Sequence, residues 1–308
     1  MTSEIIPVID AQMLRGTPAE RRTCADGIAS ACREVGFFHV VNHNVDPALL
    51  AGAFDVAQRY FARPLDAKMQ NALSADTNFC GYFPMKGEVT DPEIGADPKE
   101  GYDIAFSSDR RHAALEWPPE PADLPGVLTR YHEALSALAQ DLSRGFALAL
   151  DLPEDFFTDR LDHPTSILRL LHYPAVSHVA DRAALPETGC GAHSDYGYLT
   201  ILAQDDRGGL QVQTVDGAWI DVAPRAGAYL CNIGEMMARW TNNRFRATPH
   251  RVIRVATDSR YSVPFFFHPN ADVMIETLPT CLGEGGVTDY APITTGQYLT
   301  QRLAGAFV

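Results

Sequence analysis

The feature that most restricts how this chain folds is a series of short strand-like segments in its second half, each rich in β-branched and aromatic residues. The segments cover residues 167–173, 198–204, 210–215, 218–222, 228–233, 251–255, 261–268 and 273–278. Asp216-Gly217 lies between two of them, and this dipeptide is typical of a tight hairpin turn. Short strands separated by turns predict a sandwich or jelly roll rather than a parallel sheet built from alternating β-α units.

The first half of the chain has mainly helical periodicity. Apolar residues recur at helical spacing over residues 24–35, 50–61 and 131–150. Residues 37–41 are predicted to form a short strand between the first two of these helices. Residues 74–126 are rich in Gly, Pro and Asp, and we expect a long irregular segment on the surface there.

Together these patterns predict an α+β fold, in which N-terminal helices support a double-stranded β-helix, or jelly-roll, core. Residues 1–125 are expected to be a mainly helical N-terminal region that adds strands to the core. Residues 126–308 are expected to hold the connecting helix and the core itself. A chain of 308 residues can bury a sizeable interior, and we expect one compact structural unit.

Charge and composition exclude several classes of function. The net charge is −14 and the pI is about 5.1, without the basic stripe that a nucleic-acid-binding protein needs. No stretch approaches the roughly 20 apolar residues of a membrane helix, and the N-terminus lacks the features of a secretory signal. The six cysteines include no Cys-x-x-Cys pair and are expected to be reduced. We therefore expect a cytoplasmic protein with neither nucleic acid nor membrane as partner; the oligomeric state stays open, and a monomer is compatible with the sequence.

Candidate metal ligands stand at His193 and Asp195. Residues i and i+2 of a strand point to the same face of a sheet, so both side chains can reach one ion. With ten histidines and 39 acidic residues in 308, however, roughly one His-x-Asp/Glu pattern is expected by chance. On its own the pattern is better explained as a surface histidine followed by an aspartate in a turn.

A third ligand is available at His250, which lies 250 − 195 = 55 residues beyond Asp195 and at the head of a predicted strand. Two imidazoles and one carboxylate on one face leave adjacent positions on a metal open, as in iron(II) oxygenases. Catalytic zinc sites also use two histidines and a carboxylate. These three residues therefore indicate a metal site without deciding between iron and zinc.

A candidate anion-binding pair follows at Arg260 and Ser262, on one face of the next predicted strand and 260 − 250 = 10 residues beyond His250. A guanidinium and a hydroxyl can bind a carboxylate through charge-assisted hydrogen bonds. An arginine inside a β core is costly without an anionic partner, which is either a buried acidic side chain or a ligand. A 2-oxoglutarate molecule that chelates the metal at one end would present its other carboxylate to this pair.

Several segments, in order, resemble the 2-oxoglutarate- and iron-dependent dioxygenase superfamily, in particular the branch of isopenicillin N synthase and the plant flavonoid and gibberellin oxygenases. The resemblance extends over nearly the whole chain, through Ile6-Pro7-Val8-Ile9-Asp10, Glu34-Val35-Gly36-Phe37-Phe38-His39-Val40-Val41-Asn42-His43, Gly191-Ala192-His193-Ser194-Asp195-Tyr196-Gly197, Asn232-Ile233-Gly234-Glu235, Arg239-Trp240-Thr241-Asn242, Thr248-Pro249-His250-Arg251-Val252 and Arg260-Tyr261-Ser262-Val263-Pro264-Phe265-Phe266. The number and order of these matches make the resemblance far more specific than any one motif.

Residue by residue, the resemblance implies iron on His193, Asp195 and His250, and the distal carboxylate of 2-oxoglutarate on Arg260 and Ser262. Further roles follow from the same resemblance. Tyr173 matches a tyrosine that hydrogen-bonds the metal-chelating end of 2-oxoglutarate in many relatives, although Leu171 stands where plant relatives have asparagine. Phe266 falls where relatives place an aromatic ring against the substrate. Asn44 replaces a usual glycine, and asparagine tolerates positive φ well enough to keep the same turn.

The function that the resemblance implies is a dioxygenase that uses Fe(II), 2-oxoglutarate and O2 to hydroxylate, desaturate or cyclise a small-molecule metabolite. One alternative is an iron oxidase of the isopenicillin N synthase type that does not use 2-oxoglutarate; another is an ethylene-forming reaction. An inactive jelly roll that only binds a ligand is disfavoured, because a binding module does not need three metal ligands. The sequence does not reveal the substrate, whose contacts are expected in loops such as residues 78–105.

Overall fold

The computed structural model describes residues 6–74, 80–106, 117–175, 188–254 and 258–303. Two β-sheets that face each other form the centre of the fold. The strands of the larger sheet are β1 (Val8–Asp10), β2 (Phe37–Val41), β3 (Gly81–Phe83), β4 (Glu100–Phe106), β5 (Thr165–Tyr173), β7 (Leu199–Gln204), β10 (Tyr229–Ile233) and β12 (Arg260–His268). The smaller sheet contains β6 (Thr188–His193), β8 (Leu210–Gln213), β9 (Trp219–Asp221) and β11 (His250–Ile253).

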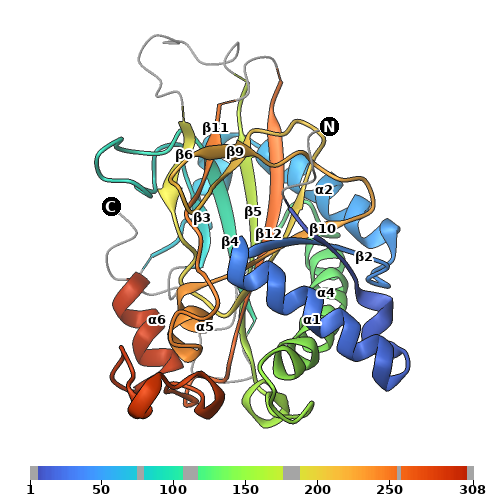
Figure 1. Cartoon of the computed structure of the whole chain (residues 1–308). Helices are drawn as coiled ribbons and strands as arrows, with labels where there is room; N and C mark the ends of the chain where they lie inside the picture. The colour runs from blue at the N-terminus through green and yellow to red at the C-terminus, as the bar shows by residue number, and fades with distance from the viewer. Residues whose placement is uncertain (1–5, 75–79, 107–116, 176–187, 255–257, 304–308) are drawn as a thin grey trace.

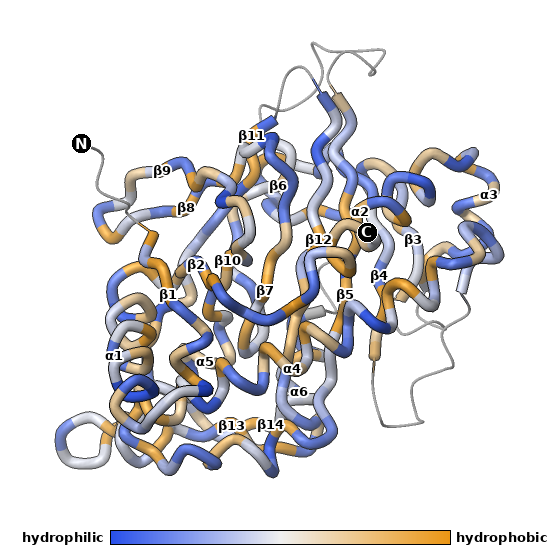
Figure 2. Tube along the Cα trace, turned by 90° about the vertical axis from the view of Figure 1, so that its right-hand side faces the viewer, coloured by the Kyte–Doolittle hydropathy of each residue, from blue (hydrophilic) through white to orange (hydrophobic). Residues whose placement is uncertain are grey.

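The order of strands in the larger sheet is β1-β2-β10-β7-β12-β5-β4-β3, and in the smaller sheet it is β6-β11-β8-β9. Figure 2 places β8 and β9 at one end of the fold and β3 at the other. Between the sheets, Phe37, Leu171 and Tyr173 of the larger sheet pack with Cys190 and Val252 of the smaller one. A separate pair of two-residue strands, β13 (Met274–Ile275) and β14 (Ile293–Thr294), lies near the C-terminus. The expected α+β jelly-roll architecture is confirmed.

Helices pack against the outer face of the larger sheet (Figure 1). The helices of the fold are α1 (Pro18–Glu34), α2 (Pro47–Phe61), α3 (Leu65–Met69), α4 (Leu124–Ala149), α5 (Glu235–Trp240) and α6 (Thr295–Leu303), with short 3-10 helices at Ala11–Arg15, Thr158–Arg160, Pro279–Cys281 and Glu284–Gly286. Of these, α1 to α4 contact strands of the larger sheet, whereas α5 contacts β13 and α6 contacts β14. Within the described ranges, no helix combines the length and the apolar character that crossing a membrane requires.

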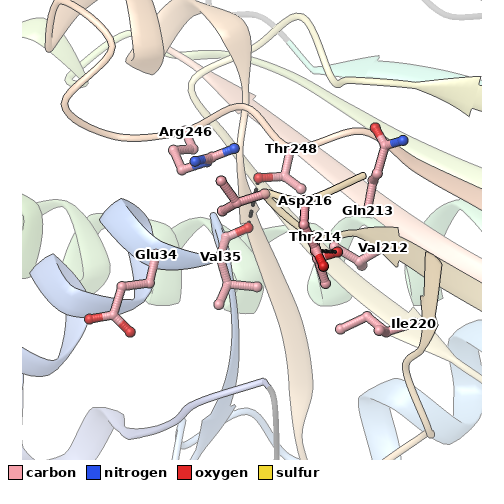
Figure 3. Close-up of a pocket in the computed structure, with 10 residues that line it drawn as sticks. Glu34, Val35, Val212, Gln213, Thr214, Asp216, Ile220, Arg246 and Thr248 are labelled. Atoms are coloured by element: carbon pink, nitrogen blue, oxygen red, sulfur yellow. Dashed lines mark hydrogen bonds between the residues drawn. The ribbon is translucent and has the colours of Figure 1, made fainter. Parts of the chain in front are cut away.

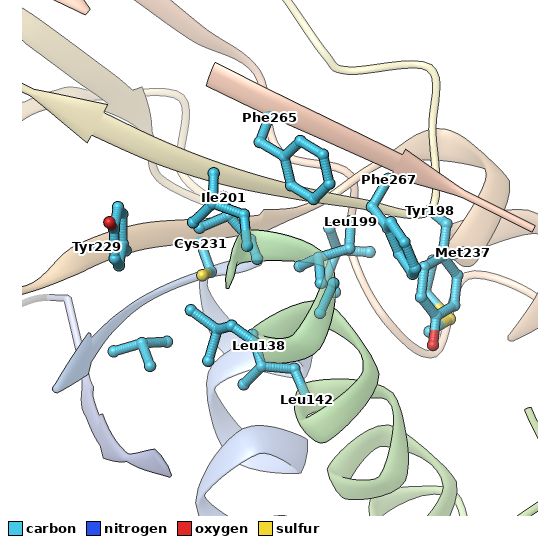
Figure 4. Packing of buried hydrophobic residues seen from close by; sticks show 14 of the residues in the cluster. Leu138, Leu142, Tyr198, Leu199, Ile201, Tyr229, Cys231, Met237, Phe265 and Phe267 are labelled. Carbon is cyan, nitrogen blue, oxygen red and sulfur yellow. The ribbon is translucent and has the colours of Figure 1, made fainter. Parts of the chain in front are cut away.

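The longest helix, α4, supplies the apolar surface that holds the larger sheet in place. Leu138 and Leu142 of α4 lie against Leu199 of β7 and Phe267 of β12 (Figure 4), and all four are at most 2% exposed. Full burial of such side chains contributes roughly 1.5–3 kcal/mol each. The opposite face of the same strands is therefore left to face the smaller sheet and to carry the polar site.

Several local predictions are confirmed. The hairpin between β8 and β9 has Gly217 at φ 85°, where a residue without Cβ is favoured. Asn44 adopts φ 63°, as expected of an asparagine in place of glycine. The sequence Asp46-Pro47 also explains where α2 begins, because Asp46 accepts a hydrogen bond from the Ala48 N–H and proline is favoured as the first residue of a helix.

The expectation of an irregular surface segment at residues 74–126 is wrong for the part of it that forms β3 and β4. Polar residues at Glu100 and Asp103 obscure the strand pattern of β4, yet both side chains are buried. Each has a basic partner at 2.6 Å: Lys68 Nζ for Glu100 and Arg169 Nε for Asp103. Pairing is what makes buried charges tolerable, so this strand could not be recognised without its partners.

Other differences from the predicted elements are smaller. The strand expected at residues 273–278 is reduced to the two residues of β13, and β6, α5 and α6 were not predicted as elements. Val255, the expected end of a strand, lies outside the described residues, as do residues 75–79 and 107–116 of the expected irregular segment.

One histidine of α4 makes folding stability depend on pH. His132 stacks on Phe106 with ring centroids 3.7 Å apart and hydrogen-bonds the Ser166 hydroxyl at 2.8 Å. Burial lowers the pKa of His132 to about 4, whereas an unfolded histidine titrates near 6.5. The unfolded chain therefore takes up the proton first as pH falls. The contribution of neutral His132 to the free energy of unfolding is fully present above pH 6.5. It is lost as the pH falls towards 4, by up to about 3 kcal/mol.

Urea unfolding between pH 7 and pH 4 measures this effect. We expect the free energy of unfolding of the wild type to fall more steeply than that of His132→Gln, which keeps a hydrogen-bonding group but cannot titrate. Parallel pH curves for the two proteins would contradict the assignment. Buried His268, whose pKa is also lowered to about 4, remains in both proteins and contributes equally to them.

Candidate metal and co-substrate site

Two antiparallel strands and the turn that follows one of them bring the three predicted metal ligands together. His193 at the end of β6 pairs in register with His250 at the start of β11, and their ring centroids are 4.3 Å apart. Asp195 lies just beyond β6, with its Oδ1 3.8 Å from His193 Nε2 and 3.6 Å from His250 Nε2. One potential ligand atom from each side chain thus lies within 4.8 Å of the others.

The remaining polar atoms of these side chains are bound elsewhere. His193 Nδ1 donates to the Gly191 carbonyl at 2.9 Å, and His250 Nδ1 donates to the Thr248 carbonyl at 3.2 Å. Because a carbonyl oxygen only accepts, these bonds place the ring proton on Nδ1 and leave Nε2 as a lone-pair donor. Such outer contacts orient ligands in metalloproteins. Both imidazoles are therefore held in the tautomer that can bind a metal through Nε2.

The Asp195 carboxylate is oriented in the same way. Its Oδ2 accepts hydrogen bonds from the Thr200 hydroxyl on β7 and from the Asn232 amide on β10, each at 2.6 Å. Its Oδ1 faces the two imidazoles. Thr200 and Asn232 were not recognised from the sequence, because only the antiparallel pairing of β7 with β10 shows that both face Asp195.

The electrostatics of the site suit a divalent cation. Burial raises the pKa of the Asp195 carboxyl, but the neighbouring His250 and His193 and the hydrogen bonds from Asn232 and Thr200 outweigh burial, so the net pKa lies below its usual value. Burial, reinforced by His193, lowers the pKa of His250 to about 4. Near neutral pH this pair offers a carboxylate and an uncharged imidazole, which are the forms that bind metal.

The predicted anion-binding pair lies between the same two sheets, on β12. Arg260 is 2% exposed, and its Nη1 donates to the Ser262 hydroxyl at 3.2 Å. Its Nε donates to the Gly208 carbonyl at 2.8 Å and its Nη2 to Gln204 Oε1 at 3.2 Å. The guanidinium also lies 4.9 Å from the centre of the Tyr173 ring, which is the register partner of Arg260 on β5.

The hydrogen-bond acceptors that hold Arg260 in place are uncharged. Within the described ranges, no salt bridge joins its guanidinium to an acidic side chain. The alternative that Arg260 forms a salt bridge with a buried acid is therefore not supported there, and the half-buried Asp205 acts on the guanidinium only from beyond salt-bridge distance. Neutral acceptors orient the guanidinium without neutralising it, so it remains available for an anionic ligand.

Phe266 lies on the same face of β12 as Arg260 and Ser262, whereas Phe265 and Phe267 point into the helix-covered core (Figure 4). The Phe266 side chain is only partly buried. Its ring centre lies 5.7 Å from the guanidinium carbon of Arg169. The ring is thus placed on the side of the sheet where the metal ligands are, rather than in the core.

A hollow of about 260 Å³ borders Thr248, whose carbonyl accepts the His250 Nδ1–H, on the side away from the proposed ligand atoms. Val35, Val212, Ile220, Arg246 and Thr248 are among the residues that line it (Figure 3), and neither the three ligands nor Arg260 and Ser262 belong to its lining. Thr248 closes one side by donating to the Val35 carbonyl at 2.7 Å. The hollow is therefore not part of the metal and co-substrate site.

Family models match both parts of the chain. The model described as 2OG-Fe(II) oxygenase superfamily matches residues 164–269, and that described as non-haem dioxygenase in morphine synthesis N-terminal matches residues 6–120. A 2-oxoglutarate-Fe(II) type oxidoreductase of Emericella nidulans, hxnY, is 32% identical over 303 residues, which cover 94% of this chain and 86% of that protein. The chain belongs to the 2-oxoglutarate–Fe(II) oxygenase superfamily.

Other members of the superfamily cover the chain to a similar extent. Homoarginine-6-hydroxylase 2-ODD-233 of Oryza sativa is 33% identical over 90% of this chain and 88% of its own length. Among solved structures, a full-length Neurospora crassa protein in complex with alpha-KG and thymine has a TM-score of 0.88 at 31% identity, covering 97% of this chain and 96% of that chain. JOX2 in complex with 2OG, Fe and JA has a TM-score of 0.82 at 30% identity, covering 97% and 84%.

Membership of this superfamily decides between iron and zinc and fixes the class of reaction. The protein is a 2-oxoglutarate-dependent dioxygenase, with iron as its metal and 2-oxoglutarate as co-substrate. The set of two imidazole nitrogens and one carboxylate oxygen described above fits ferrous iron in such enzymes.

Proposed function

We propose that this oxygenase binds ferrous iron through His193 Nε2, Asp195 Oδ1 and His250 Nε2 and oxidises a small organic molecule held beside that centre. The observation that carries the proposal is the orientation of the three side chains. Each has one polar atom fixed by a hydrogen bond within the protein and the other directed at the same point. Three ligands on one face leave the positions that a co-substrate and dioxygen require.

We assign the distal carboxylate of 2-oxoglutarate to Arg260 and Ser262. The buried guanidinium and its neutral acceptors support this assignment, because a carboxylate there would complete an ion pair in a dry environment. Tyr173 lies against the same guanidinium and is assigned to the chelating end of the co-substrate. Burial raises the pKa of Tyr173 to about 12, so its hydroxyl stays protonated and can donate a hydrogen bond.

When bound, iron and 2-oxoglutarate together supply the oxidation: one oxygen atom of O2 goes into succinate, which forms with release of carbon dioxide, and the other serves to oxidise the substrate. The protein contributes positioning and the exclusion of water. Phe266 is proposed to contact the substrate, since its partly exposed ring lies on the metal-binding side of β12.

The reaction is tested by measuring succinate and oxidised substrate in the same assay. We expect succinate in proportion to product, with both absent when iron is chelated. Product without succinate would instead indicate an oxidase of the isopenicillin N synthase type, and ethylene would indicate fragmentation of 2-oxoglutarate. Binding without any turnover would indicate a ligand-binding module. Homoarginine and thymine are the first candidate substrates to test, because one relative is named a homoarginine-6-hydroxylase and one similar solved structure contains thymine.

A further inference from the structure

Five ionisable side chains that the site does not use gather beside strand β6: Glu88, Asp97, Lys99, Asp103 and Arg169. Glu88 is 9% exposed and Asp97, Lys99 and Asp103 are each 2% exposed. Charged groups are rarely buried to this extent without a specific purpose or partner. All five are connected, because Lys99 binds Glu88 and Asp97, and Arg169 binds Glu88 and Asp103.

Asp97 connects this cluster to the strand that carries His193. Its Oδ1 accepts a hydrogen bond from the Gly191 N–H at 2.9 Å, and the Gly191 carbonyl in turn accepts the His193 Nδ1–H at 2.9 Å. β6 is an edge strand whose one partner in the sheet is β11. The carboxylate of Asp97 therefore binds an edge N–H group that β11 does not satisfy.

The segment before β4 also packs closely against β6. A Cβ atom at Gly191 would lie 2.5 Å from Asp91 Cβ and 2.9 Å from the Asp91 backbone nitrogen, so only glycine fits. Lys99 Nζ lies 3.3 Å from Cys190 Sγ, one residue before Gly191. Lys99 is also the cation that compensates Asp97, and the Thr90 hydroxyl donates to the same carboxylate.

Of the three proposed ligands, His193 is the most exposed and is held by the fewest contacts from other strands. Its side chain is 26% exposed, against 11% for His250 and 7% for Asp195. His250 lies on β11, which is flanked by β6 and β8, and Asp195 is held by two side chains from the larger sheet. The His193 ring is instead held by the Gly191 carbonyl, which belongs to its own strand.

We propose that Asp97, charge-compensated by Lys99, is a positioning residue for the metal centre. It fixes the Gly191 backbone and, through it, the His193 imidazole opposite His250. The inference rests on the proposed assignment of His193 as an iron ligand. It adds to that assignment a buried ion pair from the segment before β4, which acts on His193 through the backbone of β6. A weaker side-chain contact runs parallel to it, because Cys190 Sγ lies 3.3 Å from Lys99 Nζ and 3.9 Å from His193 Nδ1; both double variants change that contact equally.

A matched pair of double variants isolates the hydrogen bond. Asp97→Asn with Lys99→Met and Asp97→Ala with Lys99→Met both remove the two charges, but only the first keeps a side-chain oxygen for the Gly191 N–H. Calorimetric titration of the metal-free proteins with Mn(II) gives the metal Kd directly, without turnover. We expect the alanine form to bind Mn(II) about 10- to 100-fold more weakly than the asparagine form, as for other outer contacts of metal ligands.

Glu100→Gln serves as the control for general loss of stability. It breaks a buried ion pair with Lys68 on the opposite face of the larger sheet, so it lowers the thermal midpoint without changing the Mn(II) Kd. Equal Kd values for the two double variants would overturn the inference, as would a loss of affinity in Glu100→Gln that matches the alanine form. Failure of the wild type to bind Mn(II) would instead contradict the proposed metal site itself.

Discussion

Replacing His193 with alanine is expected to abolish turnover while leaving the protein folded. Even changes to the outer contacts of metal ligands cost about 10- to 100-fold in affinity or activity, so loss of a ligand is expected to cost more than 100-fold. The side chain is 26% exposed, and its removal leaves no large cavity, so the thermal midpoint should change little. Succinate release and calorimetric Mn(II) binding measure the two parts of the prediction.

His43→Ala is the matched control, because His43 is a partly exposed histidine that contacts Tyr229 at 4.6 Å between ring centroids and no ligand of the metal. We expect His43→Ala to keep both activity and Mn(II) binding. An active His193→Ala enzyme with unchanged Mn(II) affinity would remove His193 from the ligand set and with it the geometry proposed for the site.

Replacing Arg260 with alanine is expected to raise the KM for 2-oxoglutarate roughly 10- to 150-fold, since a charge-assisted contact contributes about 1.5–3 kcal/mol. Arg260→Lys should restore only part of the affinity for 2-oxoglutarate, because an ammonium group cannot form the bidentate hydrogen bonds of a guanidinium. The KM is measured from succinate formation at saturating substrate. Mn(II) binding in the absence of 2-oxoglutarate should be unaffected, which separates this variant from those of the metal ligands.

Arg207→Ala removes a positive charge from the chain segment next to Gly208 without changing the anion-binding pair Arg260 and Ser262, because Arg207 pairs with Asp258 at 2.7 Å. Its KM for 2-oxoglutarate is expected to stay at the wild-type value. A KM that is unchanged in Arg260→Ala as well would show that the distal carboxylate binds at residues other than Arg260.

Much of the architecture could be predicted from the sequence because the strands of the second half have strong local signals. The Asp216-Gly217 turn and the apolar segments around it predicted the β8–β9 hairpin, and the i, i+2 spacing placed the side chains of His193 and Asp195 on one face. His250 was added from its position at the head of a predicted strand and from the family resemblance. The side chains of Arg260 and Ser262 lie on one face, as the period of a strand requires. The hairpin and the pairs on one strand face depend on contacts within one strand or between consecutive segments, whereas His250 depended on the resemblance to a known family.

What could not be predicted depends on partners far away in the chain. β4 was missed because Glu100 and Asp103 are polar, and only the positions of Lys68 and Arg169 explain their burial. The hydrogen bonds that orient Asp195 come from strands whose order in the sheet is not evident from the sequence. The hydrogen bond between Asp97 and Gly191 joins residues 94 positions apart, and no sequence pattern at either position predicts it.

The most direct test of this account is a crystal structure of the protein grown with Mn(II) and 2-oxoglutarate, with the metal located by its anomalous scattering. We expect a single strong peak in contact with His193 Nε2, Asp195 Oδ1 and His250 Nε2, and a 2-oxoglutarate molecule that joins this metal to Arg260. A metal bound away from those three atoms, or a co-substrate whose far carboxylate does not reach Arg260, would contradict the proposed site.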